Sequence, residues 1–282
     1  MVTLGQGCDN MKYPKEIIRS SKIIYIPRNS YNRMDNPIPY KDKPFFFKDI
    51  ESLDKYFNEL LGSLLAPKFD LKTVKYSLDC IELPNDTIYG LISPSFLRNK
   101  KYVLSDEIIG TRKVPNGISN LESITTFFKH NEDYERFILE LLKMTVLDFY
   151  MNQIDRVKEN FHIIEEKNKL SLAPLYDYSE SFNSIYDDST YDYAFYYPIN
   201  RGSKSYIYAN AIMKLEFPSQ ELYTLFERYP LFKSYFERIL DIDMEELLNK
   251  IRKKYDIETP RCLEKHYLDY DKEKKEFVKS LL

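Results

Sequence analysis

Two carboxylates and one carboxamide lie near one another in the second half of the sequence, and their types suit one kind of chemistry. Asp155 precedes Asn160 by five residues, and Asp177 follows Asn160 by seventeen. Phosphoryl transfer uses a carboxylate that orients the attacking hydroxyl and accepts its proton. It also uses oxygen ligands that hold Mg²⁺ against the nucleotide phosphates, and Asn and Asp side chains supply such ligands. The spacing alone is weak evidence, because an Asp and an Asn five residues apart are also expected by chance.

The elements predicted around these residues place them at helix and strand ends. Apolar residues recur with a helical period over 133–151, which predicts a long helix that ends just before Asp155. A short hairpin is predicted at 161–173, and Asp177 follows it directly. Asp155 and Asn160 therefore fall in a loop between a helix and a strand, and one hairpin separates them from Asp177.

The local sequence at these positions resembles a known family. Asp-Arg-x-x-x-Asn at 155–160 and Leu-Ala-Pro-x-Tyr-Asp at 172–177 resemble the catalytic and metal-binding segments of the HipA-like serine/threonine kinases. The first motif is also similar to the loop of the phosphatidylinositol kinases, whose fold the HipA group shares. The resemblance implies that Asp155 is catalytic, that Asn160 and Asp177 bind Mg²⁺, and that ATP is the phosphoryl donor.

The same resemblance extends to the first part of the chain. In the family a Lys that ends a strand contacts the nucleotide phosphates and pairs with a Glu of the next helix. Three phenylalanines precede Lys48 in a predicted strand, and Glu59 lies in a predicted helix over 53–65. We therefore expect Lys48 to contact the α/β-phosphates and Glu59 to fix Lys48. A glycine-rich loop is absent, so the polar segment 28–34 is expected to cover the phosphates through Ser30 and backbone N–H groups.

The sequence departs from the family pattern at several points. Val157 stands where the family often has His, and Gln153-Ile154-Asp155 stands in place of Asn-x-Asp. The resemblance covers roughly residues 20–180, and we expect a short, single-module member without the long amino-terminal subdomain of the HipA toxins. These differences bear on rate and substrate more than on fold.

The remaining patterns predict an α+β fold with two lobes. Residues 1–95 are expected to form a small, sheet-containing N-terminal lobe, with strands at 22–26, 45–48, 72–83 and 86–93 around the helix at 53–65. Residues 96–282 are expected to form a larger, mostly helical lobe, with helices at 120–129, 133–151, 219–228, 231–240, 243–255 and 261–281. A long loop is predicted at 182–206. Such a bilobal, protein-kinase-like fold would hold ATP and Mg²⁺ in the cleft between the lobes.

Composition bounds the partners and the compartment. The net charge of −3 argues against nucleic acid as a direct partner. The Lys-rich runs 250–254 and 272–275 lie among Asp and Glu residues and are typical of solvated helix faces. The three cysteines are far apart and contain no CxxC pair, which argues against a disulfide framework and a zinc site. No stretch approaches the roughly 20 apolar residues of a membrane span. A soluble, cytoplasmic protein without a membrane partner is expected.

The sequence thus predicts a kinase that transfers the γ-phosphate of ATP to a Ser or Thr hydroxyl of a protein. The resemblance adds autophosphorylation and an antitoxin-like partner as further expectations. Two alternatives stay open. One is a lipid or small-molecule kinase on the same fold. The other is a non-catalytic, pseudokinase-type module that binds a partner through its helical lobe.

Overall fold

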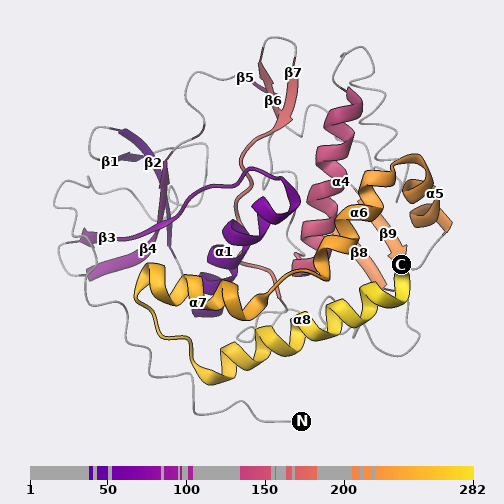
Figure 1. The fold of residues 1–282 in the computed structure, drawn as a ribbon. Coiled ribbons are helices and arrows are strands. Elements are labelled where there is room, and N and C mark those ends of the chain that lie inside the picture. The colour runs from indigo at the N-terminus through magenta and orange to yellow at the C-terminus, as the bar shows by residue number, and fades with distance from the viewer. Residues whose placement is uncertain are drawn as a thin grey trace.

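The computed structural model of the chain describes residues 38–40, 43–49, 53–83, 86–94, 96, 101–103, 134–153, 156, 163–166, 169–182, 205–209, 213–217 and 220–282. These residues form helices and three small antiparallel sheets (Figure 1). The expected α+β class is confirmed, whereas the division into two lobes at residue 95 stays a prediction. Several predicted features lie outside the described residues, namely Ser30, Asp155, Asn160, the strand at 22–26, the helix at 120–129 and most of the loop at 182–206.

A four-stranded antiparallel sheet lies in the first part of the chain. Its strands are β1 (Ile38–Tyr40), β2 (Lys43–Asp49), β3 (Ser77–Leu83) and β4 (Asp86–Pro94), in the order β1-β2-β4-β3. Gly90 lets β4 approach β2 closely, because a Cβ atom there would lie 2.2 Å from the carbonyl oxygen of Lys48. The predicted strands at 45–48 and 86–93 are therefore confirmed.

The predicted strand at 72–83 is confirmed only in its second half. β3 begins at Ser77, and the residues before it run as extended chain that makes one parallel bridge, between Thr73 and Leu175. The bridge fixes the approach to β3 against the segment that carries Asp177. Propensity could not show this, because the partner of Thr73 lies 102 residues further along the chain.

The predicted helix at 53–65 is present as α1 (Leu53–Leu65), and a short 3₁₀ helix, η2 (Ala66–Phe69), follows it at Pro67. The apolar stripe of α1 is buried in the core, with exposed fractions of at most 9% for Tyr56, Phe57, Leu60, Leu61 and Leu65. Two polar side chains of the same helix, Asn58 and Glu59, are also buried, at 1% and 0% exposure. Buried polar groups need partners, and these two residues belong to the site described below.

The helices predicted for the second part of the chain are confirmed where the structure describes them. They are α4 (Tyr134–Met151), α5 (Gln220–Arg228), α6 (Pro230–Ile239), α7 (Met244–Tyr255) and α8 (Arg261–Leu281). The capping box at the start of α7 forms as expected, because the Asp243 carboxylate accepts a hydrogen bond of 2.8 Å from the Glu246 backbone amide. α7 packs against both α1 and α8.

Two smaller sheets complete the described structure. β5 (Lys101–Val103), β6 (Ile163–Glu166) and β7 (Lys169–Leu172) form one of them, and the predicted hairpin at 161–173 is its β6–β7 pair. The other, β8 (Ser205–Ala209) with β9 (Met213–Phe217), was not predicted. The alternation of apolar side chains at 213, 215 and 217 is the signal that could have found it.

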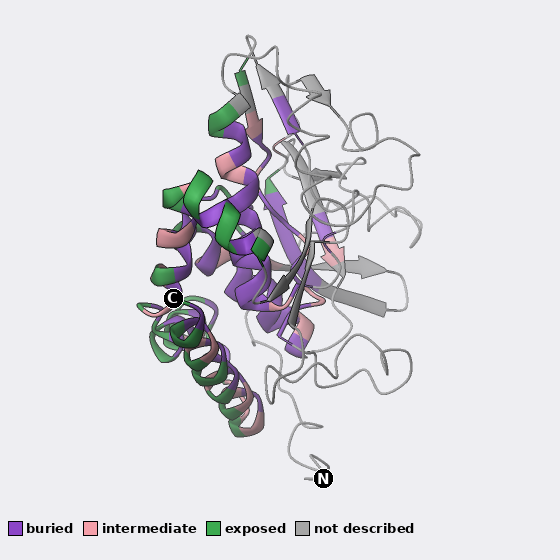
Figure 2. Cartoon of the chain, turned by 90° about the vertical axis from the view of Figure 1, so that its right-hand side faces the viewer, coloured by how far each residue is buried: buried purple, intermediate pink, exposed green. Residues whose placement is uncertain are grey.

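One continuous hydrophobic core joins α1, α4 and the C-terminal helices α5 to α8 (Figure 2). Aromatic side chains supply much of its volume where α4 and α8 meet. The rings of Tyr267 and Tyr270 each pack edge-on against Phe182, at centroid distances of 5.3 Å. This core fixes α1 and the end of α4 relative to α8.

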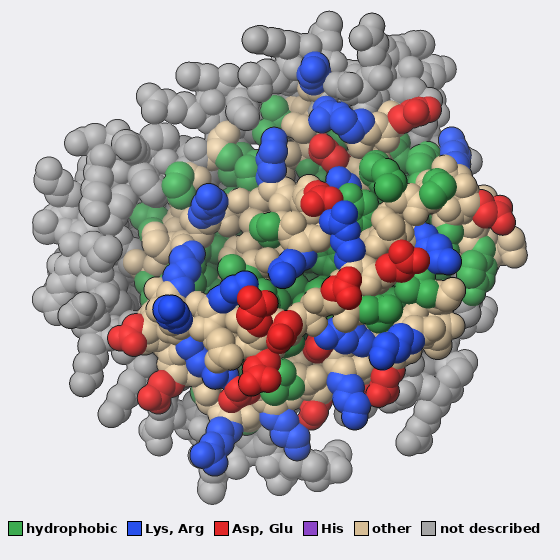
Figure 3. All heavy atoms as spheres, viewed as in Figure 1, with side chains coloured by type: hydrophobic (Ala, Val, Ile, Leu, Met, Phe, Trp, Pro, Cys, Tyr) green, Lys and Arg blue, Asp and Glu red, His purple; other side chains and the backbone are tan. Residues whose placement is uncertain are grey.

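Two expectations about charge and cysteine need correction. Lys274, in a run interpreted as a solvated face, is only 3% exposed, because the helical period turns it toward the core. Elsewhere on α7 and α8 acidic and basic side chains do alternate on the surface (Figure 3). Cys262 is disulfide-bonded, although spacing in the sequence argued against a disulfide framework. Spacing in the sequence does not show which cysteines meet in space.

None of the described helices is long and apolar enough to cross a membrane.

Candidate active site

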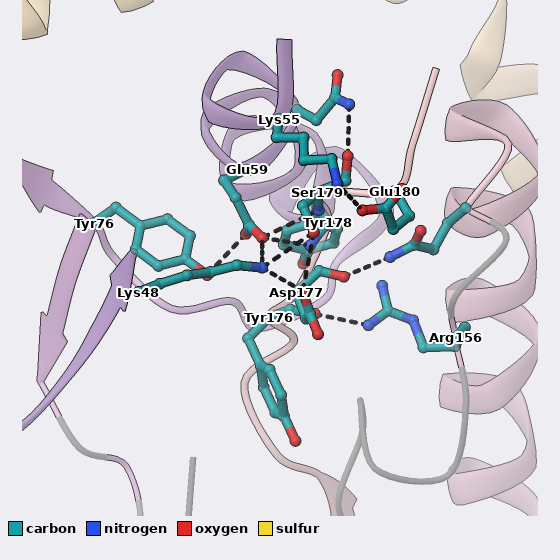
Figure 4. Close-up of polar contacts among 12 residues, drawn as sticks. Lys48, Lys55, Glu59, Tyr76, Arg156, Tyr176, Asp177, Tyr178, Ser179 and Glu180 are labelled. Carbon is teal, nitrogen blue, oxygen red and sulfur yellow. Dashed lines mark hydrogen bonds and ion pairs between the residues drawn. The ribbon is translucent and has the colours of Figure 1, made fainter. Parts of the chain in front are cut away.

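Three of the predicted site residues meet at one point between β2, α1 and the segment that follows β7 (Figure 4). The Lys48 ammonium group forms ion pairs with Glu59 Oε1 and with Asp177 Oδ1. It also donates a hydrogen bond of 3.2 Å to Ser179 Oγ. Residues separated by 11 and 129 positions in the sequence therefore share one charged cluster.

The three charged side chains differ in their access to solvent. The Glu59 side chain is 0% exposed, whereas those of Lys48 and Asp177 are 23% and 29% exposed. Glu59 is thus an internal support, and the other two side chains keep part of their surface available to a ligand. Partly exposed charged side chains in a cluster of this kind are candidates for ligand binding.

The electrostatics of the cluster keep Lys48 and Asp177 charged. Burial by itself would lower the pKa of Lys48, but the carboxylates of Asp177 and Glu59 raise it above its ordinary value. Burial likewise opposes ionisation of Asp177, yet the Lys48 ammonium group holds the pKa of that carboxyl below its usual range. The site therefore presents one firmly protonated cation and one firmly ionised carboxylate.

Glu59 is held by donors from three directions. Its Oε1 atom accepts the backbone amides of Tyr178 at 3.0 Å and Ser179 at 3.1 Å, besides the Lys48 ammonium group. Its Oε2 atom accepts the Tyr76 hydroxyl at 2.9 Å. Burial, and then the nearby Glu59 charge, raise the pKa of Tyr76 well above its ordinary value, so the phenol stays a donor. Glu59 consequently fixes both Lys48 and the backbone that follows Asp177.

Asp177 has an unusual backbone conformation, with φ at 58°. This left-handed region costs an L-residue about 1–2 kcal/mol, although Asp tolerates it better than most. The strain is supported on both sides, because the Gln153 side-chain amide donates to the Asp177 carbonyl oxygen and Glu59 holds the next two amides. Backbone strain of this kind is concentrated at functional sites.

Arg156, the second residue of the Asp-Arg-x-x-x-Asn motif, connects that motif to the same segment. Its guanidinium group is fully buried and forms hydrogen bonds of 3.1–3.2 Å with the Asp148 carboxylate of α4. It also donates at 2.7 Å to the carbonyl oxygen of Tyr176, the residue before Asp177. Burial alone would lower the pKa of Arg156, but Asp148 raises it, so the guanidinium group stays charged. Arg156 thereby links α4 to the backbone that carries Asp177.

The structure brings together Lys48, Glu59 and Asp177, as the resemblance implied, while Asp155, Asn160 and Ser30 lie outside the described residues. The functional roles of all six stay predictions. Sequence reasoning missed the supporting residues, namely Asn58, Tyr76, Gln153, Arg156 and Ser179. The Arg of the Asp-Arg-x-x-x-Asn motif was a usable signal for Arg156, and so was the family position of Gln153. No sequence pattern marked Asn58, Tyr76 or Ser179.

The donor set fits a magnesium–nucleotide complex. Within the described part of the chain, no three His, Cys, Asp or Glu side chains gather into a metal-binding group. Mg²⁺ nevertheless needs only one or two protein carboxylates when substrate phosphates and water supply the other ligands. Asp177 offers one ionised carboxylate, and Lys48 offers a cation at the distance of a direct contact from it. A charge pair of this kind suits a phosphate group bound through both a metal and an ammonium ion.

No protein-family model matches the chain, and no curated protein matches it either. Many solved structures are similar to it, including the following two. The crystal structure of the proinflammatory kinase CtkA of Helicobacter pylori has a TM-score of 0.60 and 15% identity, over 94% of this chain and 96% of that chain. The toxin–antitoxin complex of HipA, HipB and operator DNA from Shewanella oneidensis MR-1 gives a TM-score of 0.52 and 12% identity. That match covers 84% of this chain but only 57% of the other.

At such low identity the likeness is one of fold. The match to CtkA runs over nearly the whole of both chains, and the match to the HipA complex agrees with the motifs at 155–160 and 172–177. The resemblance inferred from the sequence is therefore confirmed at the level of architecture. This chain is a protein with the HipA-like kinase fold.

Proposed function

We propose that the chain is a kinase that uses ATP and Mg²⁺ to phosphorylate a Ser or Thr hydroxyl of a protein. The observation that carries the proposal is the meeting of Lys48, Glu59 and Asp177 in one charged cluster. A phosphate-binding lysine, an anchoring glutamate and a metal-binding aspartate are the parts that a kinase must bring together before transfer. The likeness in fold to the kinase CtkA supports the same reading.

In this proposal each residue of the cluster has one task. Lys48 holds the α/β-phosphates with its ammonium group, and Glu59 keeps that group in place from inside the core. Asp177 holds Mg²⁺ together with Asn160, and Ser30 covers the phosphates. Bound Mg²⁺ would neutralise charge that builds up on the phosphate oxygens during transfer. Lys48 and Asp177, which contact each other directly, would then each face the phosphates rather than only one another.

Asp155 is proposed as the residue that orients the acceptor hydroxyl. The acceptor oxygen forms a bond to the γ-phosphorus, the bond from that phosphorus to the β–γ bridging oxygen breaks, and ADP leaves. The hydroxyl proton passes to the Asp155 carboxylate. Asp155 precedes Arg156, whose guanidinium group binds the carbonyl oxygen next to Asp177. The assignment of Asp155 and Asn160 rests on the resemblance of their motif.

The choice of a protein acceptor and of partners is also proposed from likeness. HipA is found with HipB in the similar complex, so an antitoxin-like partner is a reasonable candidate for this chain too. Autophosphorylation is proposed as a second outcome of the same chemistry. With a net charge of −3, the chain itself is not proposed to bind nucleic acid directly.

The direct test is phosphotransfer by the purified chain, with ATP labelled on the γ-phosphate and Mg²⁺ present. Label should appear on the chain or on an added protein, and Lys48→Met and Asp177→Ala should abolish it. Lys250→Met is the matched control, because Lys250 forms an exposed ion pair with Glu246. Activity that persists in Lys48→Met and Asp177→Ala would refute the proposal.

A binding measurement separates the remaining alternatives. A ligand that binds only the folded state raises its melting temperature, so ATP should stabilise the wild type more with Mg²⁺ than without it. This dependence should fade in Asp177→Ala. Mg²⁺-dependent binding without transfer to any acceptor would favour the non-catalytic module. Label transferred only to lipid or small-molecule acceptors would favour the other kinase class.

A further inference from the structure

Asn58 occupies a central place beside the charged cluster although it is not itself charged. It precedes Glu59 in α1 and is 1% exposed. Its side-chain amide group donates to the carbonyl oxygens of Ser179 and Ser181, each at 2.8 Å. Its side-chain oxygen, Oδ1, accepts a hydrogen bond of 2.8 Å from the Tyr267 hydroxyl of α8. A buried carboxamide with three good hydrogen bonds has its position and its orientation fixed.

Asn58 and Glu59 together hold one residue of the Asp177 segment, Ser179, through both of its backbone polar groups. The Ser179 amide donates to Glu59 Oε1 at 3.1 Å, and the Ser179 carbonyl oxygen accepts from Asn58 at 2.8 Å. Ser179 lies two residues after Asp177, and its hydroxyl donates to the Asp177 carboxylate at 3.3 Å. The position of Asp177 therefore depends on both neighbouring residues of α1.

α8 determines how Asn58 is oriented. The Tyr267 ring lies between Phe57 and Phe182, at centroid distances of 6.4 and 5.3 Å, so its hydroxyl is held in one place. Burial raises the pKa of Tyr267 well above its ordinary value, which keeps the hydroxyl a donor. A flipped Asn58 amide would turn its oxygen toward two carbonyl oxygens and its nitrogen toward a donor. Tyr267 and the two Ser carbonyl groups hence select one orientation.

The same helix also holds the far end of the segment. The Phe182 carbonyl oxygen contacts Nε2 of His266 in α8 at 2.6 Å, and the Phe182 backbone amide donates at 2.6 Å to the carbonyl oxygen of Met151, the last residue of α4. α8 thus supports the segment after Asp177 at two places. Tyr267 acts indirectly, through its bond to Asn58, and His266 contacts Phe182 directly. These contacts make the last helix of the chain part of the support of the site.

We propose that Asn58 is a positioning residue of the kinase site, through which Tyr267 of α8 keeps Asp177 beside Lys48 and Glu59. The proposal deepens the function proposed above and, for its effect on nucleotide binding, rests on it. Its structural part stands independently, because the hydrogen bonds that the Tyr178 and Ser179 amides donate to Glu59 report the position of the segment. A variant that loosens α8 at Tyr267 should loosen these two amides before the rest of the fold.

Amide hydrogen exchange with single-residue resolution tests the structural part. Tyr267→Phe keeps the ring and removes the hydroxyl, which bonds to Asn58 at 2.8 Å and contacts the Asp54 carbonyl oxygen at 3.3 Å. Loss of the bond to Asn58 should make the Tyr178 and Ser179 amides exchange about fivefold faster. Asn58→Ala removes three bonds and should speed them roughly tenfold or more. Tyr235→Phe is the matched control, because it removes a hydroxyl bonded to the Asp70 carboxylate at 2.9 Å, away from the site. It should leave both amides unchanged.

The outcomes separate positioning from simple stability. Faster exchange at the two amides, with the amides in the middle of α4 unchanged, supports the proposal. Exchange that is the same as in Tyr235→Phe, or that rises equally throughout the chain, overturns it. If Asn58→Ala does not fold, Tyr267→Phe decides the question, because its ring packing is preserved.

Mg²⁺ dependence tests the functional part. The Mg²⁺ concentration that gives half of the ATP-induced rise in melting temperature should increase about 10- to 100-fold in Asn58→Ala. Tyr267→Phe should show a smaller increase and Tyr235→Phe none. An unchanged Mg²⁺ requirement in Asn58→Ala overturns the link to the site. If the wild type itself shows no Mg²⁺-dependent ATP binding, the proposed function fails, and the exchange experiment still decides whether Asn58 positions the segment.

Discussion

Removal of the Glu59 carboxylate should unfold or strongly destabilise the protein, because Glu59 supports the site from inside the core. The side chain is 0% exposed and accepts hydrogen bonds from Tyr76, Tyr178 and Ser179 besides the Lys48 ion pair. Glu59→Ala would leave three buried donors without this acceptor, and each such group costs about 1–3 kcal/mol. Lys48 keeps Asp177 as a partner, so the ion pair adds little to the cost. The expected loss is about 4 kcal/mol, a large share of a typical total of about 5–15 kcal/mol.

Glu59→Gln separates the loss of shape from the loss of charge. A carboxamide oxygen can still accept the Tyr178 and Ser179 amides, and its amino group can donate to the Tyr76 hydroxyl oxygen. The free energy of unfolding should therefore fall by only about 1 kcal/mol. The Lys48 ammonium group, with one carboxylate fewer beside it, should hold ATP in a less defined position, and phosphotransfer should fall.

Urea denaturation followed by circular dichroism measures these differences. Glu246→Ala is the control, because Glu246 forms an ion pair with Lys250 in which both side chains are 49% exposed. Pairs of that kind contribute about 0–1 kcal/mol. A Glu59→Ala variant as stable as Glu246→Ala would refute the role of Glu59 as a buried anchor. Equal stability of the Ala and Gln variants would refute the hydrogen-bond account.

Three further predictions concern stability and catalysis. Burial lowers the pKa of Lys274 from 10.5 to about 7, so between those pH values the unfolded chain binds a proton that the folded chain does not. The free energy of unfolding of the wild type should therefore rise with pH across this window. Lys274→Met should be more stable than the wild type at pH 7 by about 2 kcal/mol and should lose this advantage as pH rises. Urea denaturation at pH 7 and at pH 10 measures the difference. Gly62→Ala should lower the free energy of unfolding by about 1–3 kcal/mol in the same assay, because the Cβ atom of Ala would lie 2.2 Å from the buried ring of Tyr178. Helix propensity alone predicts a gain in stability, and such a gain would contradict this packing. Asp155→Asn should lower phosphotransfer about 10²- to 10⁴-fold with little change in ATP affinity or melting temperature, and retained turnover would remove Asp155 from the catalytic role.

Local patterns were sufficient for the regular elements of the fold. The apolar stripe of α1, the β6–β7 hairpin and the four C-terminal helices follow from periodicity and turn chemistry within a dozen or so residues. The capping box at Asp243 is a contact between residues three positions apart, which a sequence shows directly. Among the described elements this reasoning failed at the β8–β9 hairpin, whose second strand carried an alternation that was not used, and at the short strands β1 and β5.

The candidate site was only partly accessible to the same reasoning. Lys48, Glu59 and Asp177 were found because their motifs resemble a family, and the structure places them in contact. Their supports were not found, since the partners of Asn58 lie 121 and more positions away along the chain. Hydrophobic patterning also gives no reason for a polar side chain on the buried face of a helix.

The sequence by itself determined most of the described helices and strands, and it pointed to Lys48, Glu59 and Asp177, which the structure brings together. The tertiary structure alone decided that Glu59 and Lys274 are buried, that α8 contacts the Asp177 segment, and that Asp177 takes a left-handed backbone. The physical reason is one of range. Periodicity and propensity act between neighbours along the chain, whereas burial and charge pairing depend on which distant segments the folded core brings together.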